Sequence, residues 1–389
     1  MANFARINKM HLTMKVNNPF LTEGYAGTEY FCDRDYESRK MMAALQNGRN
    51  ITLYSSRRMG KTGLIKHVFE LFKQQDPGAR CYYIDVLHTT TLRGFVMALA
   101  DAVVGSLDSP LETIMQRAGK FFSKLRPVIT ADAVSGMPSL SFDIQQGDEP
   151  PSLKEICDYL EQSGERCYVA IDEFQQITTY PEQGVEALLR SYFQFMPHVT
   201  FVFSGSRQHL MQEMFTHPAR PFYQSTQSLS LKQVDRDCYR DFAQTFFKKS
   251  GRVLPYEQFN TVYDQVMGHT WYVQYWLNKL YDMAQGEEVT AIDVQQALLS
   301  ILREEDDNFY SYCRLLTQAE VRVLRAIAIE GRVRRPLATA FLRRHALPAT
   351  STVRSCIKNL TEKEFLIDDR GEYSVYNRFF MHWLRQQKS

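Results

Sequence analysis

Residues 55–62 read Ser-Ser-Arg-Arg-Met-Gly-Lys-Thr, between an apolar stretch at 51–53 and a segment at 61–71 whose apolar residues recur at helical spacing. A loop that binds nucleotide phosphates needs inward-turned backbone N–H groups, a helix N-terminus, a lysine for the outer phosphates and a hydroxyl for Mg²⁺. Gly60, Lys61 and Thr62 supply these groups. The loop therefore predicts binding of ATP or GTP. The residues expected around the nucleotide are Ser56, Arg57, Arg58, Met59, Gly60, Lys61, Thr62 and Gly63.

One position departs from the usual pattern Gly-x-x-x-x-Gly-Lys-Thr. Ser55 stands where the first glycine is expected, and a side chain there strains the turn if the position needs a positive φ. Two readings stay open: the serine changes the turn modestly, or it marks an ATPase tuned to bind more than to hydrolyse. A chance Gly-Lys-Thr in a helix cap would explain the motif without a nucleotide, but the flanking strand and helix argue against it.

Two acids follow an apolar run at 167–171, which is typical of a buried strand. In a parallel sheet the carboxyl ends of the strands line the ligand crevice. We therefore expect Asp172 to hold Mg²⁺ together with Thr62, and Glu173 to orient or activate the attacking water. An acidic N-cap of the next helix is the alternative explanation.

A third apolar run, at 199–203, ends in Ser-Gly-Ser-Arg. Arg207 is expected to contact the γ-phosphate, because a guanidinium stays charged and matches an anion with several oxygens. A solvent-facing helix start is the alternative for this residue. Asp85, after the run at 80–84, is either a further acid at the same crevice or a turn cap.

With these segments in place, the chain resembles the P-loop ATPases of the STAND branch of AAA+, in particular a predominantly archaeal ATPase family that also occurs in bacteria. The matching stretches are 18–20 with Gly24, Phe31 with Arg34 and Glu37, 57–62, 83–85, 171–174, 203–206 and 221–223. The resemblance implies an ATP-binding core, a helical lid and a C-terminal winged helix. Phe20, Phe31 and Arg34 are expected to build an adenine pocket, although a strand and helix cap would explain them without a ligand.

Strand and helix patterns alternate from 51 to 230, which predicts an α/β fold with a parallel sheet covered on both faces. Strands are expected at 51–54, 80–86, 167–171, 199–204 and 226–231, with a hairpin of 126–130 and 139–144 around a turn containing Gly136. The expected domains are an N-terminal segment leading into the nucleotide site (1–50), an ATPase core (51–232) with an insertion at 105–150, a helical lid (233–312) and a winged helix (313–389).

Four amphipathic helices are predicted for the lid, at 235–250, 256–267, 271–285 and 292–306. In related ATPases a residue at the start of the third lid helix approaches the nucleotide. His269 holds that place and is a candidate phosphate sensor, with a plain turn histidine as the alternative. Thr270 replaces the proline that STAND proteins usually carry there, which puts control of hydrolysis by the lid in doubt.

The segment from 317 onward begins with a capping box at 317–320 and continues with helix, strand and turn patterns typical of a winged helix. It holds 14 Lys and Arg against seven acids, a net charge of +7 in a chain whose total is +2. A basic winged helix favours DNA as a partner through Arg354, Lys358 and Arg370. Docking of this domain on the acidic remainder of the chain is the alternative.

Two further residues have competing interpretations. Arg220 precedes the last strand, where AAA+ rings place a finger for a neighbour's γ-phosphate, or it is a structural partner of an acid. His382 lies in Met-His-Trp where related proteins carry Met-His-Asp, so it is interpreted as a core or surface histidine.

Composition narrows the remaining classes. No run of 18 apolar residues and no signal-peptide core is present, so we expect a cytoplasmic protein without a membrane partner. Seven scattered cysteines without Cys-x-x-Cys spacing support neither a disulfide framework nor a zinc site. The expected function is an ATP-hydrolysing switch in which ATP or ADP sets the position of the lid and winged helix, with a protein partner or a homo-oligomer as the responding element. The alternatives are a DNA-binding ATPase resembling replication initiators or transposition helpers, and a nucleotide-binding regulator with little turnover.

Overall fold

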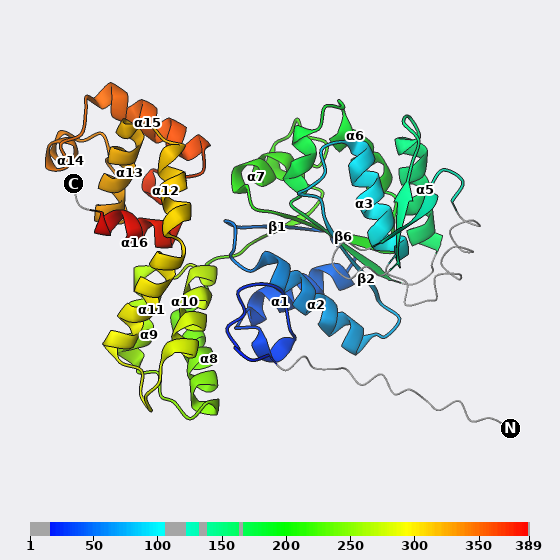
Figure 1. Ribbon diagram of the computed structural model, residues 1–389. Helices are drawn as coiled ribbons and strands as arrows, with labels where there is room; N and C mark the ends of the chain where they lie inside the picture. The colour runs from blue at the N-terminus through cyan, green and yellow to red at the C-terminus, as the bar shows by residue number, and fades with distance from the viewer. Residues whose placement is uncertain (1–15, 106–121, 132–137, 163–165, 388–389) are drawn as a thin grey trace. The chain divides into compact units, whose positions relative to one another are not determined.

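The computed structural model describes residues 16–105, 122–131, 138–162 and 166–387 (Figure 1). They form two compact units: residues 23–234, and residues 16–22 together with 235–387. Each unit is described by itself below. The expected turn at Gly136 lies outside the described residues.

A parallel sheet forms the centre of the first unit. Its five strands, all of them within the described residues, have the order β2-β5-β6-β1-β7. They are β1 Ile51–Tyr54, β2 Arg80–Asp85, β5 Cys167–Asp172, β6 Val199–Gly205 and β7 Gln227–Ser230. β1 pairs on one side with β6, where Ile51 is opposite Val202, and on the other with β7, where it is opposite Gln227. The five predicted strands and their parallel arrangement are confirmed.

Helices cover both faces of this sheet (Figure 1). Met41, Leu64 and Val68 pack with Tyr168 and Val202 of the sheet on one face. The helices of that face are α1 Asp35–Gln46 and α2 Lys61–Gln75, and those of the other are α3 Leu92–Gly105, α5 Glu149–Gln162, α6 Val185–Phe193 and α7 Gln208–Thr216. Two 3-10 turns, η1 Thr28–Tyr30 and η2 Phe174–Thr179, complete the unit. β5 and β6 are buried along their whole length, which explains why their sequences are continuous apolar runs.

The predicted hairpin is also confirmed. Its strands, β3 Arg126–Ala131 and β4 Pro138–Asp143, pair antiparallel. Phe142 is buried in the core, and its N–H donates to Asp101 Oδ1 on α3 at 2.9 Å. The hairpin is therefore fixed to the sheet unit through α3.

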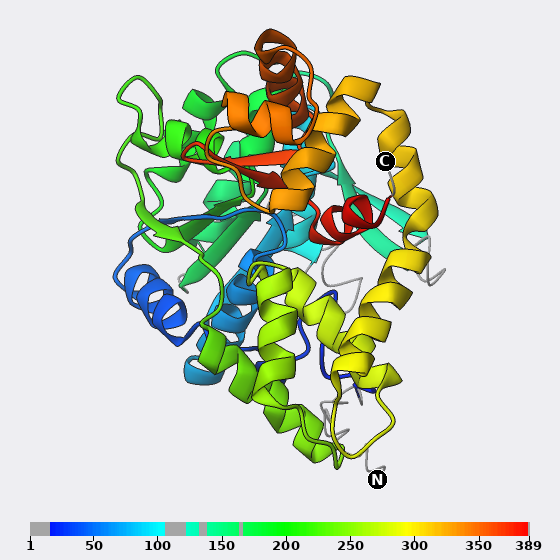
Figure 2. The same cartoon turned by 90° about the vertical axis from the view of Figure 1, so that its left-hand side faces the viewer.

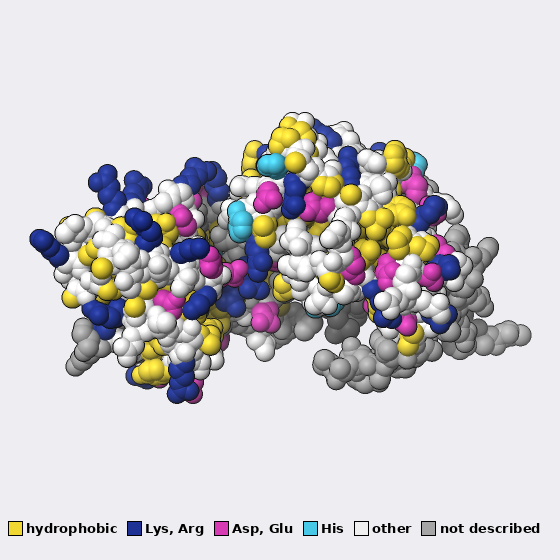
Figure 3. Space-filling view, turned by 90° about the horizontal axis from the view of Figure 1, so that it is seen from above, with side chains coloured by type: hydrophobic (Ala, Val, Ile, Leu, Met, Phe, Trp, Pro, Cys, Tyr) yellow, Lys and Arg dark blue, Asp and Glu magenta, His cyan; other side chains and the backbone are white. Residues whose placement is uncertain are grey.

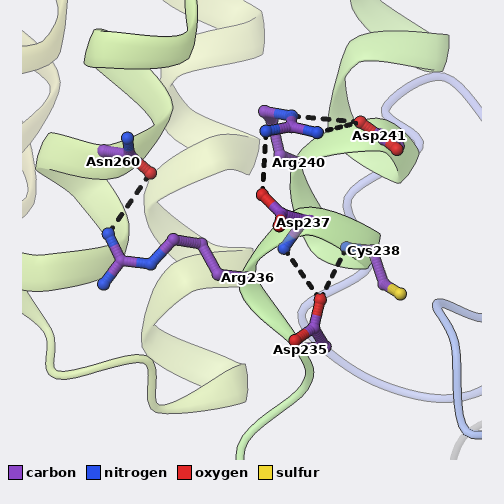
Figure 4. A network of polar contacts seen from close by, with 7 residues as sticks. All are labelled: Asp235, Arg236, Asp237, Cys238, Arg240, Asp241 and Asn260. Carbon is purple, nitrogen blue, oxygen red and sulfur yellow. Dashed lines mark hydrogen bonds and ion pairs between the residues drawn. The ribbon is translucent and has the colours of Figure 1, made fainter.

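The second unit begins with the lid helices, which run beside one another in Figure 2. They are α8 Arg236–Lys249, α9 Tyr256–Gln265, α10 Thr270–Met283 and α11 Ala291–Glu304. The Asp235 side chain caps α8 by accepting from the N–H groups of Asp237 and Cys238, at 2.9 and 3.1 Å (Figure 4). Arg236 ties α8 to α9, because its Nη1 donates to Asn260 Oδ1 at 3.3 Å. The lid thus has a defined start immediately after residue 234.

Residues 16–22 pack against the lid. Asn18 Nδ2 donates to the carbonyl of Asn278 at 2.9 Å, and the Phe20 ring lies 5.7 Å from the rings of Phe247 and Tyr281. Phe20 has no exposed surface, so it is part of the lid core. The expectation that it lines an adenine pocket is wrong, because its ring is already covered by aromatic side chains.

The winged helix follows a linking helix, α12 Asp306–Arg314. Its elements are α13 Gln318–Glu330, α14 Thr339–Arg344, α15 Thr350–Glu362, the wing strands β8 Leu366–Asp369 and β9 Glu372–Val375, and α16 Arg378–Gln386. The capping box is present, since the side chains of Thr317 and Glu320 each accept from the other's backbone N–H. The fold is therefore an α/β P-loop core, a helical lid and a winged helix, as predicted.

Helix α16 joins the winged helix to the lid. The Phe379 ring packs edge-on against Tyr272 with 5.1 Å between ring centroids, and His382 Nε2 lies 2.9 Å from the carbonyl oxygen of Gln265. Burial lowers the pKa of His382 to about 4. The interpretation of His382 as a core histidine is confirmed.

Candidate nucleotide-binding site

The phosphate loop joins β1 to α2, as the motif requires. Gly60 has a φ of 94° and Arg58 a φ of 63°, so two residues of the loop use left-handed backbone. Lys61 is only 5% exposed, and its Nζ lies 3.4 Å from the carbonyl oxygens of Ser55 and Ser56. Burial lowers the pKa of Lys61, and the charges of Glu173 and Asp172 act in the opposite direction. The ammonium group is thus held against the carbonyls of its own loop, and two nearby acids favour its charged form.

Ser55 does not occupy a glycine conformation. Within residues 55–62 the positive φ angles belong to Arg58 and Gly60, not to Ser55. Its side chain is buried, its Oγ donates to the Ser56 carbonyl at 3.0 Å, and its N–H donates to the Gly205 carbonyl at 3.4 Å. The serine therefore fits the turn without the backbone strain that a positive φ would impose.

Asp172 lies at the end of β5 and faces the start of α2. Its Oδ2 accepts hydrogen bonds from Thr62 Oγ1 and from the Tyr83 hydroxyl, each at 2.7 Å. The structure thus brings the two predicted metal ligands together. A hydroxyl and one carboxylate are the hard oxygen ligands with which proteins hold Mg²⁺ beside nucleotide phosphates, so the residues present fit this ion.

Tyr83 is a site residue that the sequence did not reveal. Burial and the Asp172 charge raise the pKa of its hydroxyl, which therefore stays protonated and donates. Tyr83 lies on β2 opposite Ala170 on β5. The sequence does not show that these two strands are neighbours, so it could not reveal the contact of Tyr83 with Asp172. Asp85, in contrast, is exposed and accepts from the Leu87 N–H at 2.9 Å, so the structure favours the turn cap.

Glu173 is held in place by two side chains. It has a φ of 55°, and its Oε2 accepts from Gln175 Nε2 at 2.5 Å and from Ser206 Oγ at 2.7 Å. Gly205 leaves room for this arrangement, because a Cβ at that position would overlap Gln175 Oε1. The ends of β5 and β6 thus position the predicted water-orienting residue jointly.

Three other predicted residues lie in different surroundings. Arg207 is exposed and directly precedes α7. His269 is buried at the start of α10, in the lid unit. Their contacts with a nucleotide stay predictions. Arg220 Nη2 lies 3.0 Å from Glu186 Oε1, so it pairs with an acid of its own chain, as the structural alternative predicts.

The segment before α1 contacts the phosphate loop and α2. The Phe31 ring stacks on His67 with centroids 4.3 Å apart, and a Cβ on Gly63 would lie 3.4 Å from Phe31 Cε2. Arg34 is 4% exposed, and its guanidinium donates to carbonyl and carboxylate groups of the protein. Phe31 therefore lies beside the first turn of α2, whereas the guanidinium of Arg34 is hydrogen-bonded to protein groups. The contacts of both residues with a base stay predictions.

No helix among the described residues is long and apolar enough to cross a membrane. A search of curated protein sequences gave no match. Among solved structures, the chain is similar to the Walker-type ATPase PABY2304 of Pyrococcus abyssi, with 17% identity, a TM-score of 0.64 and coverage of 94% of this chain and 99% of that one. It is also similar to the ORC2 protein of Aeropyrum pernix in ADPNP–ADP complexes, with 16% identity, a TM-score of 0.56 and coverage of 95% and 96%.

A third similar structure is the Aeropyrum pernix ORC1 protein in complex with DNA, with 15% identity, a TM-score of 0.50 and coverage of 91% and 92%. At these identities the likeness shows the fold alone: an α/β core, a helical lid and a winged helix. Family models are more specific: residues 307–386 match a probable winged helix domain, and residues 31–275 match an ATPase domain predominantly from Archaea. The chain therefore belongs to this predominantly archaeal family of nucleotide-binding ATPase domains, and it carries a C-terminal winged helix.

Proposed function

We propose that the chain binds Mg²⁺·ATP at the phosphate loop, hydrolyses it, and uses the nucleotide state as a switch of the STAND type. The observation that carries this proposal is the convergence of Thr62, Tyr83 and Lys61 on Asp172 and Glu173 at the carboxyl edge of the sheet. A lysine, a hydroxyl and two acids at this edge are the groups that phosphoryl transfer to water needs.

Each residue has a distinct role in this proposal. Lys61 binds the β- and γ-phosphates, and Thr62 with Asp172 holds the metal ion. Mg²⁺, when bound, neutralises charge on the phosphate oxygens. Glu173 orients the attacking water and accepts its proton, and Arg207 contacts the γ-phosphate. Phe31 offers its ring to the base.

The switch acts on the lid and winged helix as one body. Phe379 and His382 of α16 contact α10 and the end of α9, so this packing would have to break for the two parts to move separately. Glu173 connects the nucleotide site to the ends of β5 and β6, which respond when the γ-phosphate leaves. His269, at the start of α10, is the lid residue that senses phosphate in this proposal.

Isothermal titration with Mg²⁺·ATP tests the site assignment. We expect wild type to bind, and Lys61→Ala to lose tight binding because the buried ammonium is its main charge for the phosphates. Lys73→Ala, an exposed lysine on the same helix, is the matched control and is expected to bind like wild type. Wild-type affinity in Lys61→Ala would show that the nucleotide does not bind at this loop.

DNA binding is a second candidate function, favoured by the charge of the winged helix. Residues 317–389 carry a net charge of +7, and Lys and Arg side chains stand out over this region at the left of Figure 3. Arg354 and Lys358 are exposed on α15, and Arg370 is exposed at the turn between β8 and β9, with a φ of 54°.

The salt dependence of binding to mixed-sequence duplex DNA tests this second candidate. Neutralising phosphates with several of these side chains gives an affinity that falls steeply with salt, and each lost contact reduces that slope by about one. The triple variant Arg354→Ala, Lys358→Ala, Arg370→Ala is expected to flatten the slope. An unchanged slope would show that these three side chains do not contact DNA. A separate measurement, phosphate release with and without DNA, distinguishes an ATPase from a regulator with little turnover.

A further inference from the structure

We propose that Arg34 is a positioning residue of the ATPase, which orients one peptide of the phosphate loop and ties it to the segment that leads into the lid. The inference deepens the proposed function and rests on it. Arg34 is 4% exposed, and its guanidinium makes three hydrogen bonds: to the carbonyl of Met59, to the carbonyl of Lys232 and to the carboxylate of Glu37.

The bond to the phosphate loop fixes a peptide plane. Arg34 Nη2 donates to the Met59 carbonyl at 3.2 Å, and the Met59–Gly60 peptide is trans, since the chain has no cis peptide bonds among its described residues. In a trans peptide the C=O and the N–H point in opposite directions. The Gly60 N–H is therefore turned away from the guanidinium. Because backbone N–H groups of this loop type hold phosphate oxygens, Arg34 determines where one of these donors points.

The second bond reaches the segment between the sheet and the lid. The same Nη2 donates to the Lys232 carbonyl at 2.7 Å, and Lys232 lies between the end of β7 and Asp235, the N-cap of α8. One nitrogen thus joins the peptide before Gly60 to the chain that enters the lid. A rotation of that peptide on phosphate binding would change the hydrogen-bond geometry at Lys232. The loop is thereby connected, through Arg34, to the residues that precede the lid.

Arginine is suited to this place and lysine is not. The guanidinium is planar, always charged and carries five donors, so it can serve two carbonyls and a carboxylate together. Glu37 Oε1, 3.0 Å from Nη1, neutralises the buried charge. Arg34 itself has a φ of 71°, an uncommon conformation for a residue other than glycine, which is maintained where the surroundings determine it.

Two measurements on the full chain test the inference: ATP affinity by titration calorimetry, and hydrogen exchange of the loop and of residues 231–236 with and without saturating Mg²⁺·ATP. Arg34→Met is expected to weaken ATP binding by about tenfold to a hundredfold, the loss expected for a misplaced donor to a charged group. In wild type, ATP should slow exchange in both segments. In Arg34→Met, saturating ATP should slow exchange in the loop but not at residues 231–236. A purely structural role of Arg34 would not produce this difference between the two segments.

Arg34→Lys and Arg39→Met make the test decisive. Lysine keeps the buried charge but cannot serve three acceptors, so Arg34→Lys should remain folded, bind ATP more weakly and lose part of the protection at 231–236. Arg39 is exposed on α1, and Arg39→Met should behave like wild type in both measurements.

The outcomes separate the inference from the proposed function. If wild type binds ATP, Lys61→Ala does not, and Arg34→Met and Arg34→Lys match wild type in affinity and in exchange, the proposed function stands and the inference is overturned. If wild type fails to bind ATP, the proposed function itself falls. If Arg34→Met does not fold, the Arg34→Lys results alone decide between these outcomes.

Discussion

Replacing Ser55 by the glycine that the usual pattern carries should make the protein less stable without improving ATP binding. The Ser55 hydroxyl donates to the Ser56 carbonyl at 3.0 Å, a bond that contributes about 1 kcal/mol. Ser55 has no positive φ, so glycine gains nothing from its conformational freedom and costs about 0.5–1 kcal/mol in backbone entropy. We therefore expect Ser55→Gly to lower the free energy of unfolding of residues 23–234 by roughly 1.5–2 kcal/mol.

Hydrogen exchange of the β1 amides is the appropriate assay. All three tryptophans, Trp271, Trp276 and Trp383, lie outside residues 23–234, so tryptophan fluorescence reports on the lid unit and serves as an internal control. Ser55→Ala removes the hydroxyl and keeps the backbone restriction, so it should lose only the hydrogen-bond part, about 1 kcal/mol. The difference between the two variants isolates the backbone contribution.

Two results would refute this reasoning. If Ser55→Gly opened β1 no more easily than wild type, the hydroxyl and the backbone would not act as described. If Ser55→Gly bound ATP at least tenfold more tightly, the serine would distort the phosphate loop, even though its φ is not positive.

Two other residues give direct predictions. Tyr83→Phe removes the hydroxyl that donates to Asp172 at 2.7 Å. It should lower the free energy of opening of the β1 amides, measured by hydrogen exchange, by about 1.5–3 kcal/mol. An unchanged value would show that this hydrogen bond does not stabilise the fold. Burial lowers the pKa of His382 to about 4, below the value of about 6.5 in an unfolded chain, so the folded form favours the neutral ring. Its contribution, about 3 kcal/mol in full, is present above pH 6.5 and is lost as the pH falls toward 4. Tryptophan fluorescence during urea unfolding measures this, and His382→Gln should unfold with a weaker dependence on pH.

Most of the fold could be predicted from the sequence because its signals are local. The strand at 51–54 is a short apolar run before the phosphate loop, and those at 167–172 and 199–205 are apolar runs that end in acidic residues or in glycine. The capping box at Thr317 marks a helix start by itself. The docking of residues 16–22 on the lid could not be predicted, because Asn18 and Phe20 contact residues more than 200 positions away.

The candidate site shows the same division. Lys61, Thr62 and Asp172 belong to motifs that carry their own signal. Tyr83 and Gln175 do not: one requires the pairing of β2 with β5, and the other requires the close approach of Gly205. The hydrogen bonds of Arg34 could not be predicted for a similar reason, since its partners Met59 and Lys232 are 25 and 198 residues away.

Steady-state release of phosphate from Mg²⁺·ATP by Glu173→Gln tests the central claim most directly. The amide keeps the size of the side chain held by Gln175 and Ser206 but cannot accept a proton from water. We predict that wild type releases phosphate above the level of Lys61→Ala, whereas Glu173→Gln binds ATP like wild type and releases little. Turnover by Glu173→Gln equal to that of wild type, or no release by wild type above the Lys61→Ala level, would contradict the assignment of this site as an ATPase centre.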